Sequence, residues 1–154
     1  MAGFTTAFPT SAKGELPQAL HNYVTTTGNV FKLALGIASP IGTYGAATTN
    51  YSNLTGNSDE VPNGSGYTTG GFVWTAAQNI TPGTSGTGAF WQWSVNPSWT
   101  SASFSTSGCV IYNSSSGNRA VYVGSFGGTQ TVTAGTLTLV QPTNGVGTSL
   151  LQIN

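Results

Sequence analysis

The segment Phe31-Lys32-Leu33-Ala34-Leu35-Gly36-Ile37 alternates large apolar side chains with smaller or polar ones. This period of two residues is typical of a β-strand, because successive side chains of a strand point to opposite faces of the sheet. We therefore predict a half-buried strand over residues 31–37. Ser39-Pro40-Ile41-Gly42 follows and predicts the turn that ends this strand.

A second apolar pattern predicts a β-hairpin. Cys109–Tyr112 and Ala120–Val123 flank the loop Asn113–Asn118, in which Gly117 can adopt the positive φ of a tight turn. Further runs are separated by segments rich in Gly, Asn, Ser, Thr and Pro, one of them at residues 81–88. These runs lie at residues 67–75 with a bend expected at Gly70-Gly71, at 91–95, at 100–104, at 132–139 with a change of phase at Ala134-Gly135, and at 150–153.

Together these runs predict an all-β protein. About eight short strands separated by turns, without alternating strands and helices, are typical of an antiparallel β-sandwich or a jelly-roll-like barrel. The length of 154 residues suits one domain. We predict an N-terminal arm at residues 1–10, followed at 11–154 by a single β-sandwich domain with one short helix at its start.

The predicted helix comes from an apolar spacing of three and four residues, which is the spacing of one face of a helix. Pro17 is tolerated only in the first turn of a helix, so we expect the helix to begin near residue 16. The residues that share the face are Leu16, Ala19, Leu20 and Tyr23.

Two segments are candidates for contacts with other molecules. The arm carries Phe4 and Phe8, which either dock on another subunit or fold back onto the chain's own domain. Residues 43–66 show little periodicity and predict a long surface loop. Loops of that length in compact domains are commonly functional or form interfaces.

The chain is short of charge, with 4% charged residues where an ordinary soluble domain has about 25%. Most acid–base and hydrolytic mechanisms need two or three converging titratable groups, so we predict that the chain is not an enzyme. A net charge near zero excludes an electrostatic nucleic-acid binder. Few charges remain to guard sheet edges, so we expect partners to cover these edges. The ionisable residues considered are Lys13, Lys32, Arg119, Glu15, Asp59, Glu60 and His21.

Single residues with chemical potential have simpler structural interpretations. Cys109 is the one cysteine, cannot form an internal disulfide, and is predicted as a small buried hydrophobe rather than a reactive thiol. His21 has no second histidine to complete a zinc site and is predicted to pack or to hydrogen-bond. Asp59 and Glu60 offer too few oxygens for calcium and are predicted as a solvated loop pair. We therefore predict no metal and no cofactor.

The aromatic residues leave three alternatives open: a core, a subunit interface or a platform on which sugars stack. Trp91 and Trp93 lie on one face of their predicted strand, so they can be neighbours in any of these roles. Arg119 follows the hairpin loop and can anchor a turn or a subunit contact. The candidate contact residues are Phe4, Phe8, Tyr44, Tyr51, Trp91, Trp93 and Arg119.

The stretch Ser11–Tyr23 followed by Phe31–Leu35, together with a pattern in the second half of the chain, resembles a family of small virion proteins of tailed phages. Ser11–Tyr23 followed by Phe31–Leu35 is similar to the N-terminal part of that family. The second half of the pattern is matched by Val110–Asn113, Gly117–Val121, Phe126-Gly127 and Thr131–Thr136, with Gly66–Thr68 and Gly70-Gly71 between the halves. The resemblance spans roughly residues 11–153 and implies a structural protein of the particle, without a catalytic motif to map.

The resulting expectation is a capsid decoration or cement protein, which ties major capsid protein subunits together on the outer surface of the virion. Copies of the chain would form a dimer or a trimer, and no nucleic acid or membrane would be bound. The N-terminus lacks the pattern of a signal peptide, and no run reaches the roughly 18 apolar residues of a membrane span. We therefore expect synthesis in the host cytoplasm. The alternatives are a tail or head-fibre component, with host glycans as ligands, and a carbohydrate-active enzyme, which the shortage of carboxylates disfavours.

Overall fold

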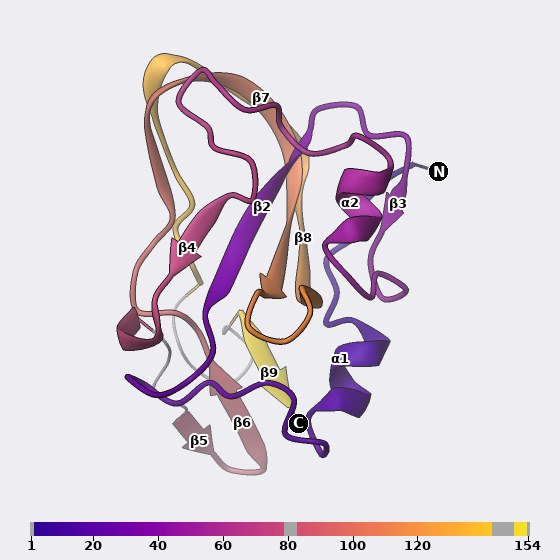
Figure 1. Cartoon of the computed structure of the whole chain (residues 1–154), viewed down its shortest axis with the longest axis vertical. Helices are drawn as coiled ribbons and strands as arrows, with labels where there is room; N and C mark the ends of the chain where they lie inside the picture. Colours follow the sequence, from indigo (N-terminus) through magenta and orange to yellow (C-terminus); the bar gives the residue numbers. More distant parts are fainter. Residues whose placement is uncertain (1, 79–82, 143–149, 154) are drawn as a thin grey trace.

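The computed structural model describes residues 2–78, 83–142 and 150–153, and its strands form three sheets (Figure 1). The largest sheet has the strand order β4-β2-β7-β8, with antiparallel pairs throughout. A second antiparallel sheet has the order β5-β6-β9, and β1 and β3 form a parallel pair. A mostly β protein with antiparallel sheets is thus confirmed, although these sheets do not close into a barrel. The strands are β1 (Gly3–Phe4), β2 (Phe31–Ile37), β3 (Thr43–Tyr44), β4 (Phe72–Trp74), β5 (Gly83–Ser85), β6 (Gly88–Trp91), β7 (Ser98–Asn113), β8 (Arg119–Thr138) and β9 (Leu151–Ile153).

The predicted helix from residue 16 is wrong, because the first helix ends one residue earlier. Residues 16–19 form turns, and Ala19 has a positive φ of 56°. A helix continuing through Pro17 from residue 10 would lose a backbone donor and crowd the preceding turn. Tyr23 stacks on Phe31 with ring centroids 4.7 Å apart, so tertiary packing outweighs the helical spacing. The described helices are α1 (Thr10–Glu15), α2 (Ser52–Gly56) and the 3-10 helix η1 (Ala76–Gln78).

None of the described helices combines the length and the apolar character needed to cross a membrane.

Strands β7 and β8 form one long hairpin that bends over the molecule (Figure 1). We call its bent part, residues 98–106 and 127–138, the arch; it descends on the side of β4. Trp99 on the inner face of the arch lies 6.2 Å from Tyr67 and 6.3 Å from Phe72, measured between ring centroids. The arch therefore packs as a second layer against the part of the chain that leads into β4.

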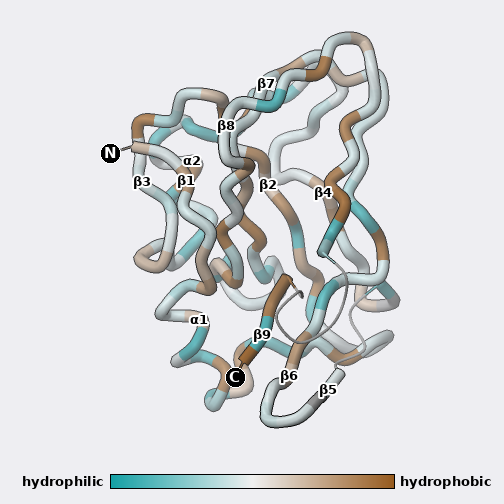
Figure 2. Tube along the Cα trace, turned by 180° about the vertical axis from the view of Figure 1, so that it is seen from behind, coloured by the Kyte–Doolittle hydropathy of each residue, from teal (hydrophilic) through white to brown (hydrophobic). Residues whose placement is uncertain are grey.

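Strand β2 is buried on both faces and not half-buried as predicted. Phe31, Leu33 and Leu35 face an aromatic core in which the rings of Trp74 and Trp93 stack with their centroids 4.6 Å apart. Ala34 faces a second core, formed with the segment after β2. Figure 2 shows the hydrophobic stretch of β2 running through the middle of the molecule.

Residues 43–66 lie largely at the surface, as predicted, but they are not a plain loop, because they fold onto the sheet and complete the second core. This segment contains β3 and α2, and it buries Tyr44 and Leu54 against the second core. Its apolar residues are too widely spaced to form a period, yet Tyr44 and Leu54 pack in the same core as Ala34 of β2. The segment therefore acts as a cover for the sheet.

Backbone irregularities fall where the sequence predicted two of them. Gly70 and Gly71 have φ of 93° and 80° and bend the chain ahead of β4. Ala134 has φ of 47°, and the β7–β8 register shifts on both sides of Ala102, whose partner is Gly135. Of the turn predicted at 81–88, residues 81–82 lie outside the described residues, while the rest forms the β5–β6 hairpin.

The strand predicted at 91–95 ends at Trp91. The backbone groups of the next residues form hydrogen bonds with a side chain and not with a neighbouring strand. The Gln141 side chain accepts a hydrogen bond from the Trp93 N–H at 2.9 Å. Its amide donates to the carbonyls of Trp93 and Val95 at 2.8 and 3.1 Å. One glutamine thus satisfies backbone groups that a neighbouring strand would otherwise pair.

The N-terminal arm folds back onto its own domain, which is one of the two predicted alternatives. Strand β1 pairs with β3, and Ala7 exchanges two backbone hydrogen bonds of 2.9 Å with Val123 in β8. Phe4 lies over Gly36 and Gly108, where a Cβ would come within 2.1 and 2.3 Å of its ring. Glycine at these two positions makes room for the aromatic ring on the sheet.

Candidate interaction surface and internal charges

Asp59 lies inside the protein with 1% of its surface exposed. Its carboxylate accepts hydrogen bonds from the N–H groups of Ile41 and Gly42, at 3.0 and 2.8 Å, and from the Tyr44 hydroxyl. Burial would raise the pKa of Asp59, but these three hydrogen bonds outweigh it and hold the pKa below its ordinary value. Asp59 therefore fixes the turn after β2 to β3.

Glu60 is buried as well, and its carboxylate accepts three hydrogen bonds. The donors are the Tyr51 hydroxyl, the Tyr67 hydroxyl at 2.7 Å and the Gly70 N–H at 2.7 Å. Burial and the negative charge of Glu60 both raise the pKa of Tyr67. The predicted solvated pair of Asp59 and Glu60 is therefore wrong, because each carboxylate is the centre of a separate buried network.

Glu15 joins the end of α1 to two distant segments. It lies 2.7 Å from His21 Nε2 and 2.8 Å from Arg119 Nη1. The Asn113 amide lies 3.1 Å from His21 Nδ1. With Asn113 donating to Nδ1, Nε2 carries the hydrogen that Glu15 accepts, which is the arrangement of a neutral ring. Burial lowers the pKa of His21 despite the nearby Glu15 carboxylate, in keeping with a neutral ring.

Acidification is expected to destabilise the protein through His21. Its folded pKa lies below the unfolded value of about 6.5, so the unfolded chain binds the proton more readily. The free energy of unfolding should fall as the pH drops below about 6.5, with the full loss reached below the folded pKa. Urea unfolding at about pH 7.5 and about pH 5.5 measures this, and His21→Gln should show the smaller difference. An unchanged difference in that variant would contradict the role of His21.

The described residues offer little chemistry beyond these networks. They contain no group of three or more His, Cys, Asp or Glu side chains that could hold a metal ion. Cys109 is buried, as predicted, and burial raises the pKa of its thiol to about 12. A thiol with that pKa is protonated at neutral pH and is a poor nucleophile.

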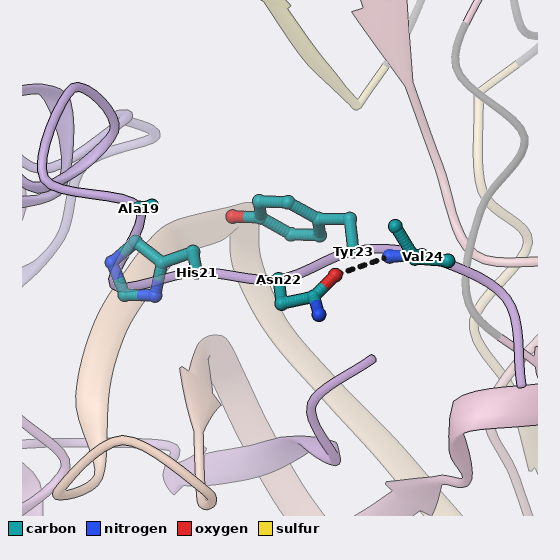
Figure 3. Close-up of a pocket in the computed structure, with 5 residues that line it drawn as sticks. All are labelled: Ala19, His21, Asn22, Tyr23 and Val24. Atoms are coloured by element: carbon teal, nitrogen blue, oxygen red, sulfur yellow. Dashed lines mark hydrogen bonds between the residues drawn. The ribbon is translucent and has the colours of Figure 1, made fainter. Parts of the chain in front are cut away.

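The described part of the chain contains at least two hollows. The first, of about 370 Å³, lies along residues 19–24 (Figure 3). Figure 3 shows that the Asn22 side chain already accepts the Val24 N–H, at 3.0 Å. Both ring nitrogens of His21 have the partners described above, Glu15 and Asn113. The second hollow, of about 360 Å³, lies between the sheet at Cys109 and residues 138–142 after the arch. Neither has the converging titratable groups of a catalytic site.

Three of the seven predicted contact residues are buried in the chain's own interior. Tyr44, Trp91 and Trp93 are buried, with 1%, 6% and 1% exposed. They fill the core, which was one of the three alternatives, and so do not form a surface platform for sugars.

The remaining predicted contact residues also have partners within the chain. Phe4 stacks on the buried Tyr44, and Phe8 meets Trp91 edge to face at 6.2 Å. Tyr51 stacks on Tyr112 at 4.3 Å. Arg119 binds Glu15, yet its side chain remains 43% exposed, and it anchors the end of the hairpin turn.

The outer face of the arch is a surface that the sequence analysis missed. Exposed hydroxyl side chains cover it, and two pairs touch across the strands: Ser98 with Thr138 at 3.0 Å and Ser105 with Thr131 at 2.8 Å. No charged residue occurs in either part of the arch. The sequence did contain a signal for this surface, because threonine recurs at alternate positions on both sides of the phase change. The exposed residues are Ser98, Thr100, Ser101, Ser103, Thr129, Thr131, Thr133, Thr136 and Thr138.

Comparison of the chain with family models, with characterised proteins and with solved structures found no match.

Proposed function

We propose that this chain is a non-enzymatic structural protein of a tailed-phage particle and that it works through its surfaces. The observation that supports a non-enzymatic role is that the carboxylates of the chain are already engaged in hydrogen bonds within it. Glu15, Asp59 and Glu60 each accept hydrogen bonds from their own chain and hold neighbouring segments of the fold together. General acid–base catalysis needs such groups directed at a substrate. The assignment to a virion comes from the resemblance of residues 11–153 to small phage virion proteins.

Within the particle, we infer the role of a capsid decoration or cement protein on the outer capsid surface. Such a protein binds across the joints between major capsid protein subunits, and many weak contacts add up through multivalency. The uncharged hydroxyl face of the arch supports this role, because it can make polar contacts without removing charges from water. We also infer that the fold is a β-sandwich of jelly-roll type, with the main sheet and the arch as its layers.

The copy number in purified particles tests this function. Quantitative mass spectrometry of the phage that encodes the chain, with a tail protein as internal standard, should find on the order of hundreds of copies per particle. A dozen copies or fewer, roughly equal to the tail standard, would replace the cement role by the alternative of a tail or head-fibre component. Absence of the chain from the particles would overturn the assignment to a virion.

Host glycan binding belongs to the tail or head-fibre alternative and has lost its best candidates. Trp91 and Trp93 are buried inside the aromatic core and are not available to a sugar. Titration of the tryptophan fluorescence with host polysaccharide should therefore leave the spectrum unchanged. A saturable change would restore the glycan-binding alternative.

A further inference from the structure

Near the end of β8, two hydrogen bonds define which backbone N–H and C=O groups point toward β7 and which point to the free edge of the strand. The Leu139 N–H donates to the Pro97 carbonyl at 2.9 Å, and the Gln141 N–H donates to Asn96 Oδ1 at 3.0 Å. Both bonds point toward the β7 side. Because the backbone groups of a strand alternate in direction, those of Thr136, Thr138 and Val140 point away from β7. The side-chain contact of Thr138 with Ser98 fits this, since residues opposite each other without backbone bonds lie closest.

No described strand pairs with this side of β8. The strand is the last one of its sheet, and its other neighbour, the bridge to Ala7, lies far away at Val123. Within the ranges that the structure describes, no hydrogen bond is made by the outward backbone groups of Thr136, Thr138 and Val140. A row of unpaired donors and acceptors is a template for another strand.

The usual features that prevent edge pairing are missing from residues 135–141. This stretch contains no lysine, no other charge and no proline before Pro142. Its last apolar residue, Val140, is 77% exposed. The β-bulge at residues 133–134 lies just before this stretch. A second register shift, between Gly135 and Leu137, has its extra residue on β7, and residues 137–139 lie opposite 97–99 in regular register.

We propose that two copies of this chain associate by antiparallel pairing of residues 135–141 about a two-fold axis at Thr138. In this register Thr138 faces Thr138 of the second copy, and Thr136 faces Val140 of the second copy. These are the residues whose backbone groups point outward, so each such pair can exchange two hydrogen bonds. The inference specifies how the proposed virion subunit would join its own copies and rests on that function only for its biological setting.

The side chains of this register are compatible on both faces of the paired strands. On the outer face, Thr136 and Val140 give a pair of β-branched residues, and Thr138 gives a pair of hydroxyls. On the inner face, half-buried Leu137 faces half-buried Leu139 of the second copy. A two-fold contact places this short stretch against its own copy, so a charge within it would lie close to the same charge of the second copy and repel it. The absence of charge from this stretch is the reason to choose a second copy as the occupant.

Sedimentation velocity of the full chain over a range of concentrations tests the proposal. Wild type should show a reversible monomer–dimer equilibrium. Thr138→Lys places two like charges at the axis and should weaken dimerisation by at least about ten-fold. Thr129→Lys adds the same charge to an exposed position of the arch outside the paired residues 135–141, and this variant should dimerise like wild type. A mixture of Thr138→Lys and Thr138→Glu should restore the dimer, because opposite charges then meet across the axis.

A wild-type chain that stays monomeric at every concentration would overturn the proposal, as would equal effects of the two lysine variants. A dimer that the mixture does not restore would also overturn the register at Thr138. Circular dichroism of each variant shows whether it is folded before its association is measured. The result of this experiment is independent of the copy number in particles. A chain that is monomeric in solution but present in hundreds of copies per particle would refute the strand pairing and leave the virion function in place.

Discussion

Replacing Gly71 by alanine is expected to lower the free energy of unfolding by about 3 kcal/mol or more, or to prevent folding. A Cβ at this position would lie 1.8 Å from the carbonyl oxygen of Leu33. That oxygen belongs to the backbone of β2, which is held on both sides by β4 and β7 and cannot move away. The positive φ of 80° adds the strain of a left-handed conformation for a residue with a side chain.

The matched control is Gly117→Ala in the hairpin turn. Gly117 also has a positive φ, of 63°, but a Cβ there would meet nothing within 4 Å. Its replacement should cost only the backbone strain, about 1 kcal/mol. Urea unfolding followed by tryptophan fluorescence measures both variants. Similar losses in the two would show that contact with β2 does not constrain position 71.

Replacing Glu60 by alanine is the second substitution for which we expect a large effect, a loss of about 3 kcal/mol or more. The change leaves the Tyr51 hydroxyl, the Tyr67 hydroxyl and the Gly70 N–H without their acceptor. Each donor that stays buried without a partner costs about 1–3 kcal/mol. The three donors lie at the start of α2, in the chain before β4 and in the glycine bend. Losing their common acceptor should therefore weaken the packing of residues 43–66 on β2.

Glu60→Gln is the control for this substitution. Its amide oxygen can still accept from Tyr67 and Gly70, and its amide nitrogen can donate to the Tyr51 hydroxyl oxygen. We expect a loss of about 1 kcal/mol for this variant, measured by the same urea unfolding. If alanine and glutamine had the same small effect, the network around Glu60 would not be important for stability.

The strands could be predicted from the sequence where apolar residues alternate without interruption. β2 is the example, and the β7–β8 hairpin turn and the phase change at Ala134 were predicted in the same way. What alternation could not reveal was the second face of β2. Its burial depends on Tyr44 and Leu54 in a segment without a period, and such isolated apolar residues give no local signal.

The internal position of the carboxylates was also beyond the reach of local patterns. Asp59 and Glu60 are adjacent in a polar stretch, which is the composition of a solvated loop. Their hydrogen-bond donors include Tyr44, Tyr51 and Tyr67, whose hydroxyls reach them only through tertiary folding. Asp59 even takes two donors from Ile41 and Gly42, in a turn that the sequence did predict.

Because the acidic groups are enclosed, the outside of this protein interacts only weakly with dissolved ions. Salt acts on exposed charges, and the contacts inferred for the arch involve hydroxyls and backbone amides in their place. The strength of contacts of this kind should be nearly the same at high and at low salt concentration.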